Sequence, residues 1–360
     1  MSHKQATVLE IVDSRDDLQI IRVQIVASDD DVLAYNYLQV GESVAQGQKV
    51  LVNTTGIDLG LGTGGVAFIV PGQSSTHKTA FGHIIKLRYT PLQLAVDSTE
   101  EQESPHHELL RDAKSIQGMP VVCCELHSQM PLVAAAIKHK APDAKAVYIM
   151  DDSAALPMAF SQLVPQVLEA KLIDVTISSG QAFGGQYEAV NLYSALLVAH
   201  LVCNAEVAIV APGPGVVGTG TAFGFSGIAQ GEALNAVAAL DGRPIAALRL
   251  SWQDARPRHR GLSHHSQTVL GQICLSPVSA AIPGDLSSGR LEELQQKLAE
   301  LARDKGHDFP LIETDFLDID LHGVKVTTMG RTQAEDPEFF SSAFAAGFLA
   351  AEELSVTSAG

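Results

Sequence analysis

The segment 119–150, which reads MPVVCCELHSQMPLVAAAIKHKAPDAKAVYIM, contains the pattern that decides the fold. Two short apolar runs, 120–126 and 146–150, flank a longer apolar segment at 130–139. Strands that are apolar along nearly their whole length are typical of a parallel sheet whose two faces are covered by helices. The segment therefore predicts a strand, a helix and a second strand of an α/β domain.

The same alternation continues to residue 250. Further strands are expected at 173–177, 206–210 and 244–250, and further helices at 157–170, 188–203 and 229–240. Beyond residue 274 the pattern loosens into a helix at 290–305, a strand-like segment at 317–327 and a last helix at 337–354. The sequence thus predicts a mainly parallel, doubly wound α/β domain over 118–360, with a crevice at the carboxyl ends of its strands.

The residues before this domain follow a different pattern. Short β-branched runs are separated by tight turns, at 6–12, 18–26 and 32–38. They predict a small all-β domain, a barrel or sandwich, over 1–96, and the glycine-rich segment 56–65 is interpreted as a tight bend in it. The acidic segment 97–117 is predicted to be a linker that ends in a short helix at 106–113.

Composition narrows the functional class. The chain has 360 residues, more than one core usually holds, and a formal net charge of −17, which disfavours nucleic acid as a partner. The absence of an apolar run long enough for a bilayer, and of a signal-peptide core at 1–7, predicts a cytoplasmic protein that does not bind membranes. The four cysteines match neither a zinc spacing nor a disulfide framework. Whether the chain forms a homo-oligomer is left open.

Polar side chains follow the predicted strands where each strand ends. Glu125 and His127 follow the first strand, Asp151 the second, and Arg249 and Asp254 the fifth. The carboxyl ends of parallel strands meet at one edge of a sheet, where ligands bind. We therefore expect one pocket at this edge, lined by His127, Asp151, Gly213, Arg249, Asp254 and His264. Helix capping explains a serine at such a position but not this set of charges.

The segment 249–268, RLSWQDARPRHRGLSHHSQT, is locally basic in an acidic chain. Arginine binds phosphates and carboxylates, and histidine transfers protons or binds metals near neutral pH. The candidate anion-binding residues are Arg249, Arg256, Arg258 and Ser263, and the candidate catalytic residues are Glu125, His127, Asp151, Asp254, His264 and His265. Arg256, Arg258 and Arg260 would point the same way in an extended loop. The alternative is that these arginines face an acidic surface of the protein itself or of a neighbouring subunit.

A glycine-rich loop follows the fourth predicted strand. It contains Gly213, Gly215, Gly218 and Gly220, of which the first three form a G-x-G-x-x-G pattern. The pattern occurs after the fourth strand rather than the first, and no ribose-binding acid ends the following strand. Small-anion binding and a purely structural turn are the two main interpretations of the loop, and dinucleotide binding ranks behind both.

A metal site is a further alternative. Adjacent residues such as His264 and His265 diverge on regular structure unless a turn redirects them. Because cysteine ligands are lacking, we expect no structural zinc and at most a weakly held ion near His127, His264 or His265. The sequence assigns no cofactor.

Several motifs together resemble a known family. They are LVNTTGIDLGLGTGG at 51–65, ELHSQ at 125–129, AFGG with EAVN at 182–191, APGPGVVGTGTAFGFSG at 211–227, the basic segment 249–268 and TTMGR at 327–331. This combination resembles the uncharacterised, chiefly bacterial family called domain of unknown function 3866, over nearly the whole chain. The resemblance implies a bacterial origin and a single-family architecture, but no activity. The chain departs from the family at Gln181, where a histidine is common.

Three functions are compatible with these observations. The first is an enzyme that acts on a small anionic metabolite, bearing phosphate or carboxylate. The second is a non-catalytic ligand-binding or regulatory protein that uses the same crevice. The third is a nicotinamide-dependent oxidoreductase that uses the glycine-rich loop.

Overall fold

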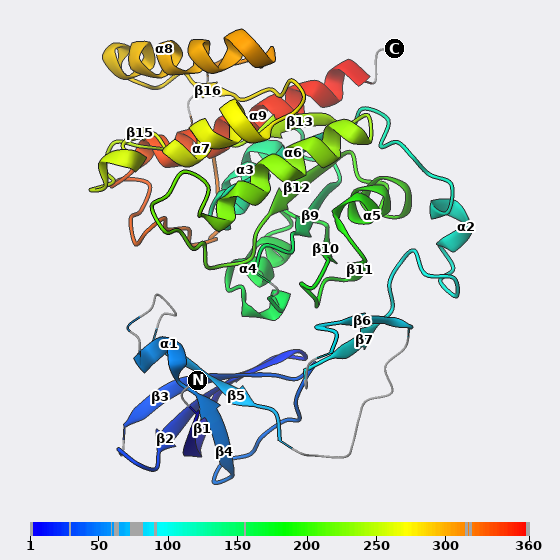
Figure 1. Cartoon of the computed structure of the whole chain (residues 1–360), viewed down its shortest axis with the longest axis vertical. Coiled ribbons are helices and arrows are strands. Elements are labelled where there is room, and N and C mark those ends of the chain that lie inside the picture. The colour runs from blue at the N-terminus through cyan, green and yellow to red at the C-terminus, as the bar shows by residue number, and fades with distance from the viewer. Residues whose placement is uncertain are drawn as a thin grey trace. The chain divides into compact units, whose positions relative to one another are not determined.

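The computed structural model describes residues 3–28, 30–58, 60, 65–72, 82–89, 92–154, 156–313, 316 and 319–357, without the side chains of 302–304 and 355–357. The chain divides into two compact units, Met1–Asp97 and Ser98–Gly360 (Figure 1). Each unit has its own hydrophobic core. In the part of the chain that is described, no helix is long and apolar enough to cross a bilayer.

The first unit contains a closed barrel of five strands. The strands are β1 (His3–Ser14), β2 (Leu18–Ile25), β3 (Asp31–Tyr37), β4 (Lys49–Asn53) and β5 (Val66–Val70), in the order β1-β2-β3-β5-β4. Alternate small and β-branched side chains such as Ala6, Val8 and Val23 fill its interior, as strand periodicity requires. The barrel prediction is therefore confirmed. Residues 56–58 of the predicted bend at 56–65 belong to helix α1 (Thr55–Asp58), and 59 and 61–64 lie outside the described residues.

A parallel sheet forms the centre of the second unit. Its strands are β8 (Pro120–Cys123), β9 (Ala146–Met150), β10 (Val175–Ser179), β11 (Tyr187–Ala189), β12 (Val207–Ala211) and β13 (Arg243–Ala246), in the order β11-β10-β9-β12-β8-β13. All pairs in it are parallel. The predicted mixed α/β architecture with a parallel sheet is confirmed. The doubly wound description is not confirmed, because β12 lies between β9 and β8.

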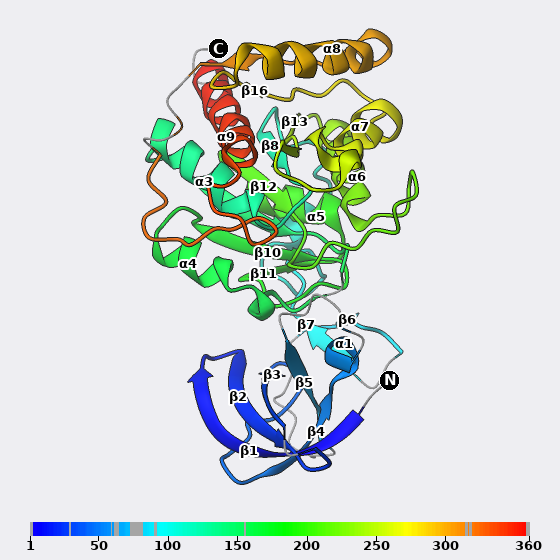
Figure 2. The same ribbon diagram turned by 90° about the vertical axis from the view of Figure 1, so that its left-hand side faces the viewer.

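Helices cover both faces of this sheet (Figure 2). One face packs against α3 (Gln129–Lys140), α4 (Leu163–Glu169) and α9 (Pro337–Thr357), and the other against α5 (Leu192–Leu197) and α6 (Ala229–Ala239). Neighbouring residues of β8 point to opposite faces of the sheet. Val122 therefore packs in the apolar layer on the face with α3, α4 and α9, and Val121 in the layer on the face with α5 and α6. The parallel sheet therefore lies between two apolar layers.

The remaining elements are short or peripheral. They are β6 (Ile84–Lys86), β7 (Leu94–Val96), α2 (His107–Leu110), β14 (Leu250–Ser251), β15 (Gly261–Leu262), α7 (His264–Thr268), β16 (Ile282–Pro283), α8 (Ser288–Lys305) and β17 (Leu311–Ile312). Single turns of 3-10 helix occur at Met158–Phe160, Ser226–Ile228 and Pro257–His259, and π-helical turns at Val198–Val202 and Val269–Ile273.

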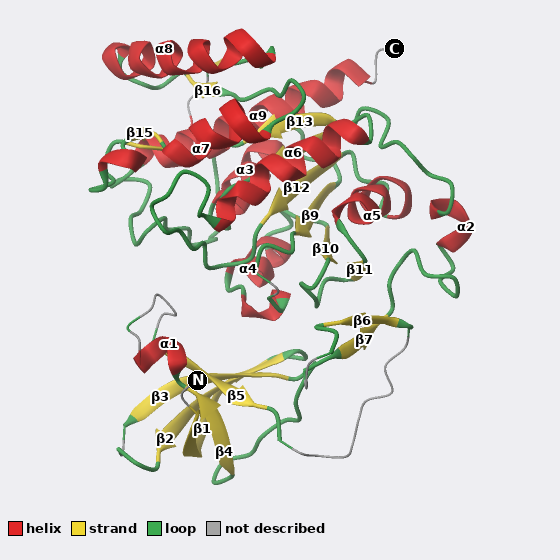
Figure 3. Ribbon diagram, in the orientation of Figure 1, coloured by secondary structure: helices red, strands yellow, loops and turns green. Residues whose placement is uncertain are grey.

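Several predicted elements differ in the structure, and the strand expected at 244–250 ends at residue 246. The helix expected at 157–170 is broken because the Ser161 hydroxyl accepts the backbone N–H groups of Leu163 and Val164 and so starts α4 anew. The helix expected at 188–203 begins only at residue 192, since 187–189 form the edge strand β11. The prediction of a strand-like segment at 317–327 was wrong, because 319–327 contain no strand (Figure 3). Residues 317 and 318 lie outside the described residues. Asp320 accepts the backbone N–H of His322 there and forms a turn.

The segment predicted to be a linker belongs to the second unit from residue 98 onward. The backbone N–H of Thr99 donates to the carbonyl of Glu188 in the edge strand β11 (2.9 Å). The carboxylate of Glu100 accepts the N–H of Val190 (2.8 Å). Residues 98–100 therefore lie against the sheet edge at β11.

Candidate functional site

The chain leaves β13 and returns to the same place after a short excursion. Leu250 in β14 pairs antiparallel with Leu262 in β15, which folds 251–261 back on itself. The N–H of Ser263 donates to the carbonyl of Arg249 (3.0 Å). The start of α7 is thereby fixed beside the carboxyl end of the sheet, where β8 also ends. This return decides which of the predicted residues meet.

Glu125 follows β8 and is completely buried. Its Oε1 accepts hydrogen bonds from Arg249 Nη1 (2.7 Å) and His265 Nδ1 (2.5 Å). Burial raises the pKa of Glu125, but the hydrogen bond from His265 and the charge of Arg249 outweigh it and lower the pKa below its usual value. The group is therefore an ionised carboxylate at neutral pH. Its Oε2 is buried without a hydrogen-bond partner among the described residues.

A glycine allows this carboxylate to sit where it does. A Cβ atom added to Gly227 would lie 2.5 Å from Glu125 Cγ. The 3-10 turn Ser226–Ile228 can approach Glu125 only because that atom is absent.

Three histidines meet next to the Glu125–Arg249 pair. His259, His264 and His265, which we call the histidine cluster, have ring centroids 4.3 to 5.0 Å apart. Each histidine offers one ring nitrogen as a ligand atom, and these three nitrogens lie within 4.8 Å of one another. Phe225 stacks flat on His265 with centroids 3.8 Å apart and holds that ring in place. The sequence predicted His264 and His265 as site residues but not His259.

The environment keeps two of these rings uncharged. Burial, together with the positive charges of Arg249 and Arg256, lowers the pKa of His259 to about 3. Burial also lowers the pKa of His264, and the neighbouring His265 adds to the effect. At neutral pH both imidazoles therefore carry a nitrogen lone pair that can accept a proton or bind a metal ion.

Two of the predicted anion-binding arginines bind acidic groups of the protein itself. Arg256 donates from Nε and Nη2 to the two carboxylate oxygens of Asp254 (2.9 and 2.7 Å). These hydrogen bonds lower the pKa of Asp254. Arg249 binds Glu125 and approaches Asp254 Oδ2 to 3.9 Å. The charges of this group therefore balance, with two arginines and two carboxylates.

Arg258 differs from these arginines. It is exposed and forms no ion pair within the described part of the chain. Its guanidinium carbon lies 3.9 Å from where a Cβ of Gly220 would be. The 3-10 turn Pro257–His259 interrupts the extended conformation expected for this segment, so Arg256 turns inward and Arg258 outward. Ser263, also a predicted ligand-binding residue, is buried, and its Oγ lies 2.9 Å from His259 Nδ1.

The glycine-rich loop forms a small exposed hairpin beside the cluster. Gly218 bridges to Phe225, and the N–H of Thr219 donates to the carbonyl of Gly224 (2.7 Å). Gly215 and Gly220 have positive φ angles, and Gly213 packs closely against Leu156. The following helix α6 begins only at residue 229, whereas the dinucleotide fingerprint opens directly into a helix. The loop geometry therefore does not favour nicotinamide binding.

His127 and Asp151 have their own hydrogen-bond partners, separate from the histidine cluster. His127 Nδ1 lies 2.9 Å from the Pro212 carbonyl, and Nε2 lies 2.7 Å from Ser161 Oγ. Burial lowers the pKa of His127 to about 4. Asp151 accepts hydrogen bonds from the N–H and hydroxyl of Ser153, and burial raises its pKa. Both ring nitrogens of His127 are thus satisfied within the fold.

A second network, which the sequence did not reveal, supports Asp254. The Ser251 hydroxyl accepts the N–H of Asp254 (3.1 Å) and donates to the buried Asp336 (2.9 Å). Arg331, from the TTMGR motif, binds Asp336 through Nε and Nη2, both at 2.9 Å. Only that motif could have drawn attention to Arg331, and no signal marked Asp336.

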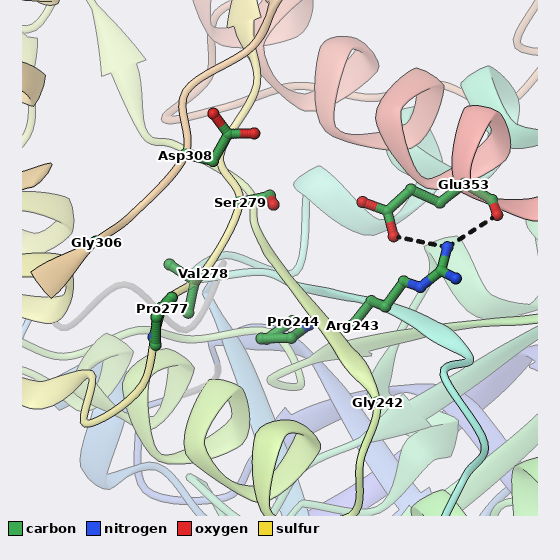
Figure 4. Close-up of a pocket in the computed structure, with 9 residues that line it drawn as sticks. All are labelled: Gly242, Arg243, Pro244, Pro277, Val278, Ser279, Gly306, Asp308 and Glu353. Carbon is green, nitrogen blue, oxygen red and sulfur yellow. Dashed lines mark hydrogen bonds and ion pairs between the residues drawn. The ribbon is translucent and has the colours of Figure 1, made fainter. Parts of the chain in front are cut away.

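The N-terminal end of β13, the end away from the histidine cluster, borders a cavity of about 300 Å³ (Figure 4). It is lined by Gly242, Arg243, Pro244, Pro277, Val278, Ser279, Gly306, Asp308 and Glu353. Arg243 Nη1 donates to the backbone carbonyl of Glu353 (3.1 Å) and lies 3.5 Å from its carboxylate. Because it opens at the start of β13, the cavity does not belong to the histidine cluster.

Comparison with known proteins gives one match. No curated protein and no solved structure matches the chain. The family model described as Protein of unknown function (DUF3866) matches residues 33–347, which include the whole parallel sheet and the histidine cluster. The predicted resemblance is confirmed, and the chain belongs to this family.

Proposed function

We propose that this chain is an enzyme that acts on a small anionic molecule at the histidine cluster, with Glu125 and Arg249 as its buried support. One observation carries the proposal: the three imidazole rings meet beside a completely buried carboxylate, one of whose oxygens has no partner within the described residues. Groups with strongly shifted pKa values that gather at the carboxyl edge of a parallel sheet are typical of functional sites.

Stability alone does not account for such a group. Replacing a buried ion pair by apolar side chains of similar volume is often neutral or stabilising. A fold that needed only packing here would be served as well by aliphatic residues in place of Glu125, Arg249 and His265. The orphaned Oε2 of Glu125 adds a further energetic cost.

Arg258 is the arginine available to bind an anionic substrate. Arg249 and Arg256 are neutralised by Glu125 and Asp254, whereas Arg258 is exposed beside Gly220 of the glycine-rich hairpin. A phosphate or carboxylate bound by Arg258 would lie close to the neutral His264, since the charge of Arg258 already acts on that ring. In the absence of a bound metal ion, an imidazole lone pair is then available to accept a proton from the bound molecule or from water.

A ligand screen tests this proposal. Thermal unfolding with phosphate, pyrophosphate, nucleotides and carboxylates would identify an anion that stabilises the protein, because binding to the folded state raises its stability. Calorimetry with the best anion would compare wild type with Arg258→Ala and with Arg260→Ala, an exposed arginine two positions away.

We expect Arg258→Ala to weaken binding about tenfold or more, and Arg260→Ala to leave it nearly unchanged. Equal affinities in the two variants would refute the role of Arg258. Binding that is lost with Arg258→Ala, but with no turnover of any bound compound, would instead favour a non-catalytic ligand-binding protein.

A further inference from the structure

We propose that His259, His264 and His265 together bind one divalent transition-metal ion, of which Zn²⁺ is the best fit, and that Glu125 orients His265 toward it. The inference rests on the proposed function in that the ion would lie at the same site, but it requires no particular substrate. Metal binding by this cluster can therefore be measured on its own.

The positions of the rings support one shared ion. Candidate ligand atoms of the three side chains lie within 4.8 Å of one another. In a tetrahedral site with zinc–nitrogen bonds of about 2.0–2.1 Å, the nitrogens are about 3.4 Å apart. Small side-chain rotations would close that difference. Adjacent histidines normally diverge, but His264 and His265 form the first turn of α7, and their ring centroids are only 4.3 Å apart.

The hydrogen bonds of the rings indicate which nitrogens are free to bind. The Nδ1 of His265 donates to Glu125, and the Nδ1 of His259 contacts Ser263, which leaves Nε2 on each ring. The Nε2 of His264 is buried and has no partner within the described residues. A buried polar atom without a partner is costly, and a metal ion would remove that cost.

Glu125 has the position of a residue that supports a ligand. Metal-binding histidines usually donate their second ring nitrogen to a carboxylate, which fixes the tautomer and makes the imidazole a stronger ligand. The 2.5 Å contact between Glu125 Oε1 and His265 Nδ1 matches this arrangement, and the stacked ring of Phe225 fixes the plane of His265. We assign Glu125 a positioning role.

The charge and ligand type define the class of ion. Glu125 and Asp254 balance the formal charges of Arg249 and Arg256 beside the cluster. Neutral imidazoles suit zinc, cobalt, nickel or copper, whereas magnesium and calcium prefer oxygen ligands. Three protein ligands leave a fourth position for water or for the anion, as in catalytic zinc sites.

Zinc titration of tag-free full-length protein, stripped with a chelator, tests the inference. Calorimetry with Zn²⁺, and with Mg²⁺ as the hard-ion control, would be run on wild type, His264→Ala, His259→Ala and the exposed His322→Ala. Thermal unfolding of each variant would confirm that it folds. His264→Ala is the least disruptive change, because Nε2 of His264 forms no hydrogen bond within the described residues.

We expect one zinc ion per wild-type chain, at least a tenfold loss of affinity in the two cluster variants and none in His322→Ala. Glu125→Gln should weaken zinc binding about 10- to 100-fold. Absence of zinc binding, or equal affinity in a folded His264→Ala variant, would overturn the inference.

The two proposals fail separately. Zinc bound at the cluster without any anion dependent on Arg258 would leave the metal site intact and refute the proposed function. Anion binding and turnover in a protein whose histidine cluster takes up no zinc would support the proposed function and overturn the metal site.

Discussion

Replacing Arg249 by methionine should destabilise the second unit strongly at neutral pH. The Arg249 and Glu125 side chains are 8% and 0% exposed, and their atoms are 2.7 Å apart. Removing one partner of a buried pair leaves an uncompensated charge and costs about 3–5 kcal/mol. The surface pair Arg111–Glu108 provides a matched control, since its atoms are also 2.7 Å apart but its side chains are 53% and 75% exposed. Arg111→Met should cost about 0–1 kcal/mol.

The pH dependence gives this prediction a second readout. The pKa of Glu125 is lowered in the folded state, so its pairing stabilises the protein above the unfolded pKa of 4.5 and the stabilisation is lost as pH falls through the folded pKa. The loss in free energy of unfolding caused by Arg249→Met should therefore become smaller as the pH falls below 4.5, because a protonated Glu125 no longer needs a charged partner.

The assay is urea denaturation followed by the fluorescence of Trp252, the only tryptophan, which lies in the second unit. Free energies of unfolding at pH 7 and at the lowest pH where wild type stays folded would be compared for the three proteins. If Arg249→Met costs no more than Arg111→Met at pH 7, the buried carboxylate does not depend on Arg249 and the electrostatic description of the site is wrong.

Three further predictions concern the surroundings of the site. Gly227→Ala should destabilise by about 1–3 kcal/mol because its Cβ would overlap Glu125, whereas Gly289→Ala, with open space around it, should not destabilise; urea midpoints distinguish the two. His127→Gln should reduce acid sensitivity: the folded pKa of about 4 lies below the usual 6.5, so between these values the unfolded state binds more protons and each unit by which the pH is lowered costs about 1.4 kcal/mol of stability. A wild-type slope retained in the variant would contradict this. Ser161→Ala should cost about 1–2 kcal/mol, since α4 loses its cap and His127 a hydrogen bond, and an unchanged midpoint would refute that role.

Local pattern predicted the elements of the second unit better than their arrangement. The runs at 120–126 and 146–150 became β8 and β9 because strand-length apolar runs are buried on both faces of a sheet. Their separation by β12 depends on pairing between residues far apart in sequence, which no local pattern records. The break before α4 likewise depends on one hydroxyl, that of Ser161, within an otherwise helical pattern.

The candidate site was predictable where it depended on strand ends. Glu125, Arg249 and His265 meet because parallel strands end at one edge and β14 and β15 return the chain to that edge. His127 was assigned to the site on the same reasoning, but its two ring nitrogens contact the Pro212 carbonyl and the Ser161 hydroxyl rather than the histidine cluster. His259 was overlooked because its neighbours alternate as arginines, and only the 3-10 turn reveals that it faces inward.

X-ray absorption spectroscopy of the zinc-loaded protein tests the metal site at the histidine cluster, because it reports the ligands of the ion itself. We expect three imidazole nitrogens at about 2.0–2.1 Å from the ion and a fourth light ligand, with no sulfur. A spectrum with a zinc–sulfur shell at about 2.3 Å, or one without imidazole scattering, would contradict it. In either case His259, His264 and His265 would not be the centre of the protein's chemistry.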